Sequence, residues 1–543
     1  MRHSVTRWTG IVLLLIASHA RALDHTKPYG EPYELAGKRL VFTNWLWVRQ
    51  GQTEWLDAQG KSVFTDKSVM AGPFDAHFVN IDGPFGVRLI AEPAIRGGKL
   101  EVKPEHPWEA NGIDIMQMLP VPGGKIMAWG ACFDEAGKKR SCYFESTDGV
   151  NWTRPKLGLV EYKGDKQNNL TPGKLQGRVF FDPHASADER FKAATNGDMT
   201  TAEFEKLRQK PAWRDRPVSM MALEDDPGKV DCVWGFTSPD GVQWKKLEDP
   251  LTIEESDGDQ TVYWDARLKK YVMYLRAYAV GARAPGYAFS ADRRHKFLPR
   301  RVIARSESED FSRFPLSQTI IGTSNEMGPS DTYYLNARTT IPGAPDLHLM
   351  FPTRYVLAED NTSLDLYTSF DGIVWSIAPG CPLMRTADFG QWDGGCMFFL
   401  PHLVERANGD WMLLYRANNF PHKYPRGKQT EGFGTVVWPK GRLMAIEAQQ
   451  KGAFTSPAFL APGTKVFINA LTSRVGEVRV EVADYDGKPV PGHSFEDSLP
   501  IIGDQFRTPL RWKESDTLGI EAGKPVVLRF RMERAKIYGL DFE

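Results

Sequence analysis

Apolar residues recur along the chain in pairs of short runs, and a turn-forming residue separates the two members of each pair. Within a run the apolar positions alternate or are continuous over the length of a strand, and Gly, Pro or Asp stands between the runs. The pairs are IMQMLPVPGGKIMAWGAC from Ile115, RVFFDPHASADERFKAAT from Arg178, TVYWDARLKKYVMYLRAY from Thr261, YYLNARTTIPGAPDLHLMFPTR from Tyr333 and MFFLPHLVERANGDWMLLYRAN from Met397. The pattern predicts five hairpins in an all-β chain.

A seven-residue phrase, Ser-x-Asp-Gly-(Val/Ile)-x-Trp, follows several of these hairpins. Asp-Gly favours the backbone angles of a tight turn, the Ser hydroxyl can bond the turn backbone, and the Trp ring can fill the gap between adjacent sheets. Its spacing exceeds that of helical solenoids and is typical of four-stranded propeller blades. The copies are FESTDGVNW (Phe144 to Trp152), FTSPDGVQW (Phe236 to Trp244), YTSFDGIVW (Tyr367 to Trp375) and an eroded SESEDFSRF (Ser306 to Phe314). The two patterns together predict a five-bladed β-propeller over residues 114–450.

The segments on either side of this region read differently. Residues 23–113 hold strand-like pieces rich in Pro and Gly, which favours edge strands wrapped on the propeller, and the region from Leu40 to Trp47 is expected to donate the outer strand of the fifth blade. Residues 451–543 continue with evenly spaced strands but without the phrase, which predicts a C-terminal β-sandwich. One helix is expected at TAEFEKLRQK, where Thr200 and Glu203 form a capping box.

The first 22 residues have the form of a signal peptide. Arg2 and Arg7 precede an apolar run, and Ala20-Arg21-Ala22 has the small-x-small form of a cleavage site. We therefore expect an exported protein, periplasmic or extracellular, that begins at Leu23. The apolar run is too short to span a bilayer, and no later stretch approaches the required length, so no membrane span is predicted.

Charge and cysteine content narrow the range of ligands. Acidic and basic residues balance at 68 each, without long blocks of one sign, which argues against a nucleic-acid partner and favours a neutral ligand. The 12% aromatic content suits stacking on a carbohydrate, and it suits blade packing equally well. No zinc-type spacing of Cys or His occurs, so neither a metal nor a cofactor is predicted. Cys132 and Cys142 can pair across one hairpin, and buried free thiols are an equal alternative. No pattern in the chain indicates an oligomeric state.

Polar residues stand at the start of each predicted innermost strand, where propeller strands converge on a central pocket. Carboxylates that converge in such a pocket separate one another's pKa values, so that one can hold a proton while another stays ionised, as glycosidic cleavage requires. The alternative is that these side chains bond backbone groups at strand ends. The residues are Asp114, Asn168 with Asn169, Asp259, Asp331 and Asp393.

Other side chains are candidates for supporting roles. Glu326 and Glu431 lie in Gly-containing loops, from which a carboxyl can reach a pocket as proton donor. Asp182 and Asp265 recur at matching places inside hairpins and are expected to form turns. Four further residues are candidates to bind sugar hydroxyls, a sugar carboxylate or a sulfate, and structural ion pairing is the alternative role for each. They are His402, Arg276, Arg338 and Arg416.

With these features the chain resembles the five-bladed propeller glycoside hydrolases of families 32, 43, 62, 68 and 117. The run FESTDGVNWTRPKLGLVEYKGDKQNNL is similar to exported bacterial proteins described as family 32-like, and the C-terminal region resembles the module appended to family 32 enzymes. The resemblance implies that Asp114 acts as nucleophile or base, Asp259 as stabiliser, and Asp331 or Glu326 as acid. NGID replaces the family 32 Asn-Asp-Pro-Asn phrase, and no Glu-Cys pair is present, so fructan specificity is not implied.

The sequence therefore predicts an exported glycosidase that cleaves a poly- or oligosaccharide with paired carboxylates. A glycan-binding propeller without turnover is the alternative. A sialidase fits less well, because its repeated box is one residue longer than the phrase found here and its propeller has six blades.

Overall fold

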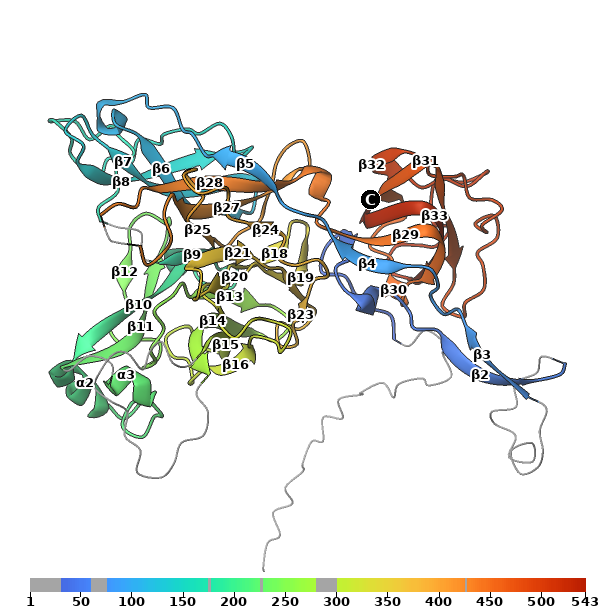
Figure 1. The fold of residues 1–543 in the computed structure, drawn as a ribbon, viewed down its shortest axis with the longest axis horizontal. Helices are drawn as coiled ribbons and strands as arrows, with labels where there is room; N and C mark the ends of the chain where they lie inside the picture. Colours follow the sequence, from blue (N-terminus) through green and yellow to red (C-terminus); the bar gives the residue numbers. More distant parts are fainter. Residues whose placement is uncertain (1–30, 60–75, 174–176, 225–227, 280–299, 425–426) are drawn as a thin grey trace, which may run out of the picture.

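The computed structural model describes residues 31–59, 76–173, 177–224, 228–279, 300–424 and 427–543 (Figure 1). The predicted signal peptide lies outside these residues. The regular structure of the described chain is nearly all strand, and none of its helices is long and apolar enough to cross a membrane. The short 3-10 turns are η1 (Trp45–Trp47), η2 (Pro107–Glu109), η3 (Ala187–Glu189) and η5 (Pro439–Gly441).

Three antiparallel sheets follow one another in the first half of the chain, each built from consecutive strands because each strand returns through a short turn. Sheet 1 contains β6 (Ile113–Val121), β7 (Lys125–Phe133) and β8 (Lys139–Ser146). Sheet 2 contains β9 (Arg178–Phe181), β10 (Phe191–Thr200), β11 (Lys229–Ser238) and β12 (Lys245–Lys246). Sheet 3 contains β13 (Thr261–Asp265), β14 (Lys270–Ala279), β15 (Arg300–Ser308) and β16 (Gln318–Ile321).

Sheet 4 consists of two four-stranded halves whose strands continue one another. One half contains β17 (Asp331–Tyr333), β20 (Thr353–Val356), β21 (Asn361–Leu364) and β24 (Met384–Arg385). The other contains β18 (Arg338–Ile341), β19 (Ala344–Met350), β22 (Tyr367–Ser369) and β23 (Ser376–Ile377). The register that pairs Thr353 with Leu364 also pairs Met350 with Tyr367, so the halves form one sheet of long, interrupted strands.

Sheet 5 closes the series with a strand from the N-terminal segment. It contains β25 (Cys396–Phe399), β26 (Val404–Glu405), β27 (Trp411–Asn418), β28 (Glu431–Trp438) and β5 (Ile95–Lys99). The expectation that the region from Leu40 to Trp47 supplies this outer strand is wrong. Leu40 lies on β1 (Arg39–Val41), which pairs with β33 (Pro525–Phe542) in another sheet. The Leu40 side chain is buried there.

Neighbouring sheets contact one another in a closed succession. β6 contacts β9, β9 contacts β13, β15 contacts β17, β21 contacts β25, and β28 returns to contact β6. Figure 1 shows the sheets arranged around a common centre, with the C-terminal strands set to one side. Buried apolar residues fill the spaces between adjacent sheets. One cluster joins Met127 and Trp129 of sheet 1 to Phe191 and Phe236 of sheet 2.

The repeated phrase forms the same turn each time. In the first copy the Ser146 hydroxyl accepts a hydrogen bond from the Gly149 amide (2.9 Å), and the Asp148 carboxylate accepts from Val150 and Asn151 (2.8 Å each). The copies at 238–244 and 369–375 repeat this pattern. The eroded fourth copy keeps the bond from Ser312 to the Asp310 carboxylate. Because each turn satisfies its own backbone groups, the phrase is structural, as its residues predict.

The remaining strands form a seven-stranded sheet and a separate hairpin. The sheet contains β1, β4 (Arg88–Ala91), β29 (Met444–Thr455), β30 (Phe459–Leu460), β31 (Val466–Ala483), β32 (Asp504–Pro509) and β33 (Pro525–Phe542), and the hairpin is β2 (Gln52–Asp57) with β3 (Ala76–Ile81). β1 and β4 of the N-terminal segment thus pair with strands of the C-terminal region, and β29 crosses the expected boundary at 450.

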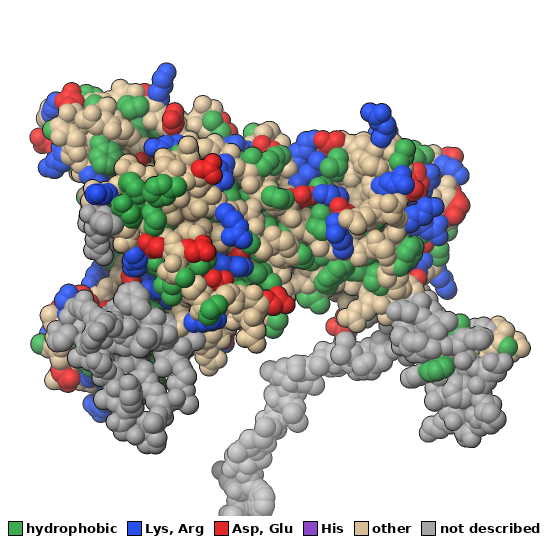
Figure 2. All heavy atoms as spheres, in the orientation of Figure 1, with side chains coloured by type: hydrophobic (Ala, Val, Ile, Leu, Met, Phe, Trp, Pro, Cys, Tyr) green, Lys and Arg blue, Asp and Glu red, His purple; other side chains and the backbone are tan. Residues whose placement is uncertain are grey.

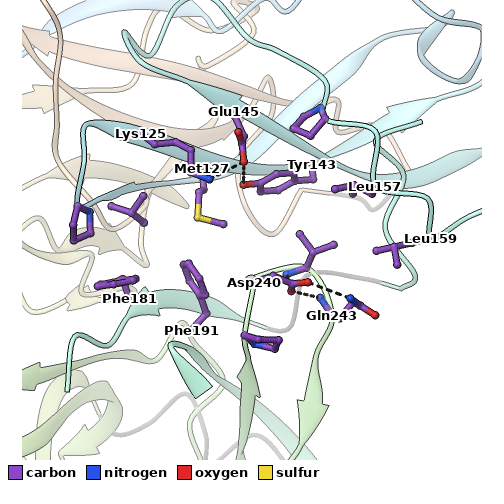
Figure 3. Close-up of a pocket in the computed structure, with 15 residues that line it drawn as sticks. Lys125, Met127, Tyr143, Glu145, Leu157, Leu159, Phe181, Phe191, Asp240 and Gln243 are labelled. Atoms are coloured by element: carbon purple, nitrogen blue, oxygen red, sulfur yellow. Dashed lines mark hydrogen bonds and ion pairs between the residues drawn. The ribbon is translucent and has the colours of Figure 1, made fainter. Parts of the chain in front are cut away.

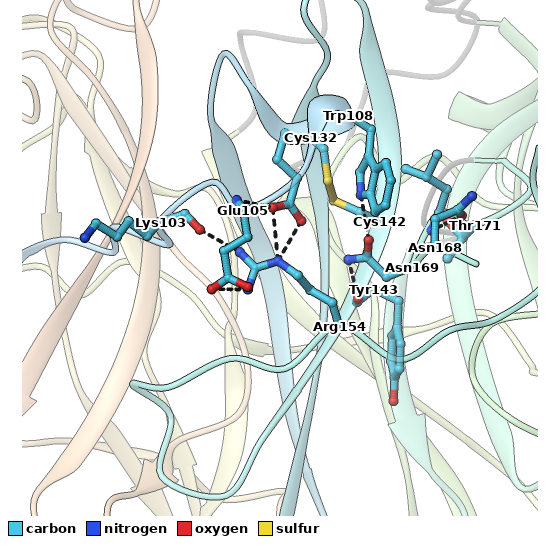
Figure 4. The surroundings of a disulfide bond; sticks show 12 residues. Lys103, Glu105, Trp108, Cys132, Cys142, Tyr143, Arg154, Asn168, Asn169 and Thr171 are labelled. Atoms are coloured by element: carbon cyan, nitrogen blue, oxygen red, sulfur yellow. Dashed lines mark hydrogen bonds and ion pairs between the residues drawn. A yellow bond between two sulfur atoms is a disulfide. The ribbon is translucent and has the colours of Figure 1, made fainter. Parts of the chain in front are cut away.

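Two local predictions are confirmed. Helix α2 (Thr201–Arg208) begins with the capping box between Thr200 and Glu203, and α3 (Met220–Glu224) follows it. Cys132 and Cys142 form a disulfide between β7 and β8, with Cα atoms 6.1 Å apart (Figure 4). The other described cysteines are free thiols. The disulfide closes the outer end of the hairpin in sheet 1.

Candidate active site

The starting ends of the inner strands are tied together by a chain of hydrogen bonds. Arg178, the first residue of β9, donates from Nη1 to the Met116 carbonyl on β6 (3.4 Å) and from Nη2 to Asp259 Oδ2 before β13 (2.6 Å). Asn336, between β17 and β18, donates to the Asp259 carbonyl (3.1 Å) and accepts from the Thr261 hydroxyl (2.7 Å). Sheets 1 to 4 therefore converge on this place.

Asp114 and Glu431 come from distant parts of the chain and lie near enough for the charge of Glu431 to act on Asp114. Asp114 lies on β6, and Glu431 is the first residue of β28, which contacts β6. Burial, and then the negative charge of Glu431, raise the pKa of Asp114 against the opposing effect of Lys139 and Lys99. Arg416 on β27 lies 3.5 Å from the Glu431 carboxylate. The two carboxyl groups thus differ in their surroundings, because burial acts on Asp114 whereas a cation lies beside Glu431.

Arg276 and Tyr334 form a second part of the site. The Arg276 guanidinium carbon lies 4.4 Å from the centroid of the Tyr334 ring, and Nη2 lies 3.1 Å from Asp257 Oδ2. The Tyr334 hydroxyl is 2.9 Å from His422 Nε2. Burial, then the charge of Lys423, lower the pKa of His422 to about 4, so its imidazole is neutral at pH 7. The site therefore places a buried cation on an aromatic face.

Asp331 and Glu326, the expected acids, do not lie together in the same way. Asp331 is buried, accepts a hydrogen bond from the Gly328 amide (3.2 Å) and lies 3.8 Å from Arg354. Arg354 is also paired with the buried Asp365 (2.7 Å). Glu326 is exposed in the loop before β17. Among the described residues, neither is hydrogen-bonded or ion-paired to Asp114 or Asp259.

The other expected binding residues have packing partners in the protein. Asp393 is buried between Arg96 (2.9 Å) and the Tyr415 hydroxyl (2.9 Å). The remaining bonds run from His402 Nε2 to the Val179 carbonyl (2.8 Å), from Arg338 Nη2 to His348 Nδ1 (2.6 Å), and from Trp108 Nε1 to Asn169 Oδ1 (2.8 Å). Figure 4 shows Asn169 beside the disulfide of sheet 1. Burial lowers the pKa of His402 to about 4. These contacts support structural roles.

Asp182 and Asp265 form turns, as predicted. Asp182 accepts from the His184 amide and from Lys192 Nζ (2.8 Å), and Asp265 accepts from the amides of Arg267 and Leu268. Each carboxylate therefore bonds groups close to it in the hairpin.

Four residues of this site were not predicted from the sequence: Arg178, Tyr334, His422 and Asp257. Arg178 is the first residue of the second predicted hairpin, and Tyr334 lies near the start of the fourth. Because inner strands begin there, these positions could have predicted that both residues face the central pocket. His422 and Asp257 lie on loops, and only the folded chain brings them to Tyr334 and Arg276. Among the described residues, no group of three or more His, Cys, Asp or Glu side chains is placed to hold a metal ion.

A separate cleft of about 490 Å³ lies between sheets 1 and 2 (Figure 3). One wall holds Lys125 and Tyr143, which both bond Glu145 Oε1 at 2.8 Å, and the facing wall holds Phe181 and Phe191. These residues belong to the ends of their strands or to later strands, so the cleft is distinct from the site at the strand starts. On the face seen in Figure 2, acidic and basic side chains are interspersed.

No protein-family model and no curated protein match the chain. The chain is similar to several solved structures. An N-acetylgalactosamine deacetylase from F. plautii, in complex with blood group B trisaccharide, is 14% identical, with 65% of this chain and 95% of that one covered and a TM-score of 0.37. A thermostable family-43 glycoside hydrolase is 11% identical (62% and 93% covered, TM-score 0.35). A Bombyx mori GH32 beta-fructofuranosidase, in complex with sucrose, is 10% identical (80% and 94% covered, TM-score 0.34). Such likeness assigns no residue a role.

Proposed function

We propose that the protein is an exported glycoside hydrolase that cleaves a poly- or oligosaccharide at the site formed by Asp114 and Glu431. The observation that supports the proposal is that β6 and β28 contact each other and carry Asp114 and Glu431, with the pKa of Asp114 raised by burial and by the charge of Glu431. Two carboxyls with different protonation states are what glycosidic hydrolysis needs.

The proposed division of roles follows from the surroundings of each carboxyl. We assign to Asp114, whose pKa is raised by burial, the donation of a proton to the departing glycosidic oxygen as the carbon–oxygen bond breaks. Glu431, beside Arg416, acts from the ionised form, either on the anomeric carbon or on the attacking water. Asp259, held by Arg178, contributes negative charge near the developing oxocarbenium ion. This reverses the role that the sequence resemblance implies for Asp114 and keeps the one it implies for Asp259.

The fold proposal accompanies this function. We take the five sheets to be the blades of a five-bladed propeller over residues 114–450, closed by β5, and residues 451–543 to be a C-terminal β-sandwich, with 23–113 wrapped on both. The closed succession of sheet contacts supports the propeller. The long strands β31 and β33, each 18 residues, support the sandwich, because strands of this length can bend across two layers.

The test is reducing-sugar release from a panel of plant and algal glycans by the purified protein. With an active glycan in hand, Asp114→Asn and Glu431→Gln are each expected to lower turnover by about 10²-fold or more. Glu477→Gln is the matched control, because Glu477 pairs with Arg479 (2.8 Å) on β31 of the seven-stranded sheet. Asp331→Asn and Glu326→Gln test the alternative acids.

Three outcomes would decide against parts of the proposal. Full activity in both Asp114→Asn and Glu431→Gln would remove the proposed pair. A loss confined to Asp331→Asn or Glu326→Gln would return the acid role to those residues. Saturable glycan binding without release of reducing ends would favour the non-catalytic glycan-binding alternative.

A further inference from the structure

Arg276 is a buried cation whose hydrogen-bonding capacity is largely unused. Arg276 lies on β14 and is 2% exposed, and its Nε, Nη1 and Nη2 have no hydrogen-bond acceptor among the described residues. A guanidinium carries five N–H donors in one plane, and burying such donors without acceptors is unfavourable. A ligand group that accepts hydrogen bonds from these donors would explain why an arginine is buried at this position.

The surroundings of Arg276 hold its guanidinium in place. One face lies against the Tyr334 ring, and the Tyr334 hydroxyl is bonded to His422. Gly258 closes another side, because a Cβ atom added there would lie 3.3 Å from Arg276 Nε. Stacking leaves the N–H groups at the edge of the plane, where a carboxylate can accept two of them in parallel.

Asp257 shows which chemistry suits this edge. Its Oδ2 lies 3.1 Å from Arg276 Nη2, whereas its side chain is 64% exposed. An exposed carboxylate forms only a weak ion pair, because water competes for it. Asp257 therefore occupies a carboxylate position beside Arg276 without filling the donors of the guanidinium, and an incoming carboxylate can displace it.

The position is close to the proposed catalytic groups. Asp257 and Gly258 immediately precede Asp259 in the loop before β13, and Asp259 is paired with Arg178. Arg178 also bonds the Met116 carbonyl, two residues beyond Asp114 on β6. A sugar ring held at Arg276 would thus lie beside the groups that act on its neighbouring bond.

We propose that Arg276 recognises a carboxylate of the substrate, so that the glycan contains a uronic acid whose carboxylate replaces Asp257 beside the guanidinium. This inference rests on the proposed function for its sugar, and on Arg276 and Asp257 for its charge.

The experiment measures binding of glucuronate, glucose and inorganic sulfate to the purified protein by titration calorimetry. Glucuronate is expected to bind and glucose to bind at least about tenfold more weakly, because glucose lacks the charge-assisted bonds. Arg276→Gln should abolish this preference. Asp257→Asn should raise the affinity for glucuronate several-fold, because it removes the internal competitor. The matched control is Arg313→Gln, since Arg313 pairs with Asp310 (3.6 Å) elsewhere on sheet 3 and should leave both affinities unchanged.

Several results would overturn the inference. Equal affinity for glucuronate and glucose would show that the carboxylate is not recognised. Sulfate binding as tight as that of glucuronate would indicate an anion site without sugar recognition. Unchanged or weaker glucuronate binding in Asp257→Asn would also count against it, and this exposed substitution does not threaten folding as a change at Arg276 can. Hydrolysis of neutral glycans without glucuronate binding would support the proposed glycosidase function and contradict carboxylate recognition by Arg276. Glucuronate binding without any hydrolysis would support carboxylate recognition and contradict the glycosidase function.

Discussion

The indole of Trp129 on β7 donates a hydrogen bond from Nε1 to the carbonyl oxygen of Gly241, the turn glycine of the second phrase, at 2.7 Å. The bond crosses from sheet 1 to sheet 2. Sheets 3 and 4 are joined in the same way, because the Tyr274 hydroxyl on β14 donates to the Gly372 carbonyl of the third phrase at 2.7 Å. The repeated turn therefore fastens each of these sheets to the sheet before it.

Tyr274→Phe is expected to destabilise the protein by about 1–3 kcal/mol, because it leaves the buried Gly372 carbonyl without its donor while the ring is kept. Urea denaturation followed by fluorescence measures the change. The control is Tyr424→Phe in the loop before β28, where the ring stacks on Phe420 and the hydroxyl makes no hydrogen bond to any other described residue. Equal effects of the two substitutions would mean that the bond to Gly372 does not hold the sheets together.

Gly241→Ala should cost more stability than Gly124→Ala. Both glycines have positive φ, 76° and 81°, so both substitutions strain the backbone by about 1 kcal/mol. A Cβ at Gly241 would also meet Met127 Cε at 2.9 Å and the Trp129 ring at 3.1 Å, whereas nothing lies within 4 Å of one at Gly124. Thermal unfolding of both variants isolates the contact between sheets. Equal midpoints would show that the close packing of Gly241 against Met127 and Trp129 does not contribute to stability.

Asp148 should make stability depend on pH in the acid range. The backbone amides of Asn151 and Val150 lower the pKa of Asp148 in the folded protein. The ionised form is thus favoured by folding, so its contribution is present above the unfolded pKa of about 3.9 and is lost as pH falls toward the folded value. Asp148→Asn is expected to lower stability at pH 7 and to flatten its decline below pH 4. Parallel stability curves for the variant and wild type would contradict the assignment.

Asp114→Asn should have the opposite effect on stability. The folded pKa of Asp114 is raised, so folding favours the protonated form, and this contribution is lost as pH rises through the folded pKa. An uncharged Asn removes that loss. The variant should therefore be at least as stable as wild type at pH 7 while turnover falls by about 10²-fold or more.

Asp393→Asn is the contrasting variant for that prediction. Asp393 is buried between Arg96 and Tyr415, so its loss of charge should lower stability by about 1–3 kcal/mol. Urea denaturation between pH 4 and 8 compares the two. A destabilised Asp114→Asn would place Asp114 among the structural carboxylates.

The features that sequence alone determined are those whose partners lie within a few residues. Ser146, Asp148 and Gly149 form their turn because the donors and acceptors are neighbours in the chain. The capping box of α2 and the disulfide within one hairpin were predictable for the same reason. The hairpins themselves follow from apolar alternation, which chain-neighbouring strands satisfy by pairing.

The tertiary structure decided every pairing between distant segments. Residues 95–99 belong to the segment predicted to wrap on the propeller as edge strands, yet they form β5 of sheet 5, where Gly97 fits closely against Thr435 of β28. Asp114 and Asp393 look equivalent in sequence, but only Asp114 meets a second carboxyl, whereas Asp393 meets Arg96. A residue type specifies what bonds are available, and the long-range packing of the sheets determines which partner is there to make them.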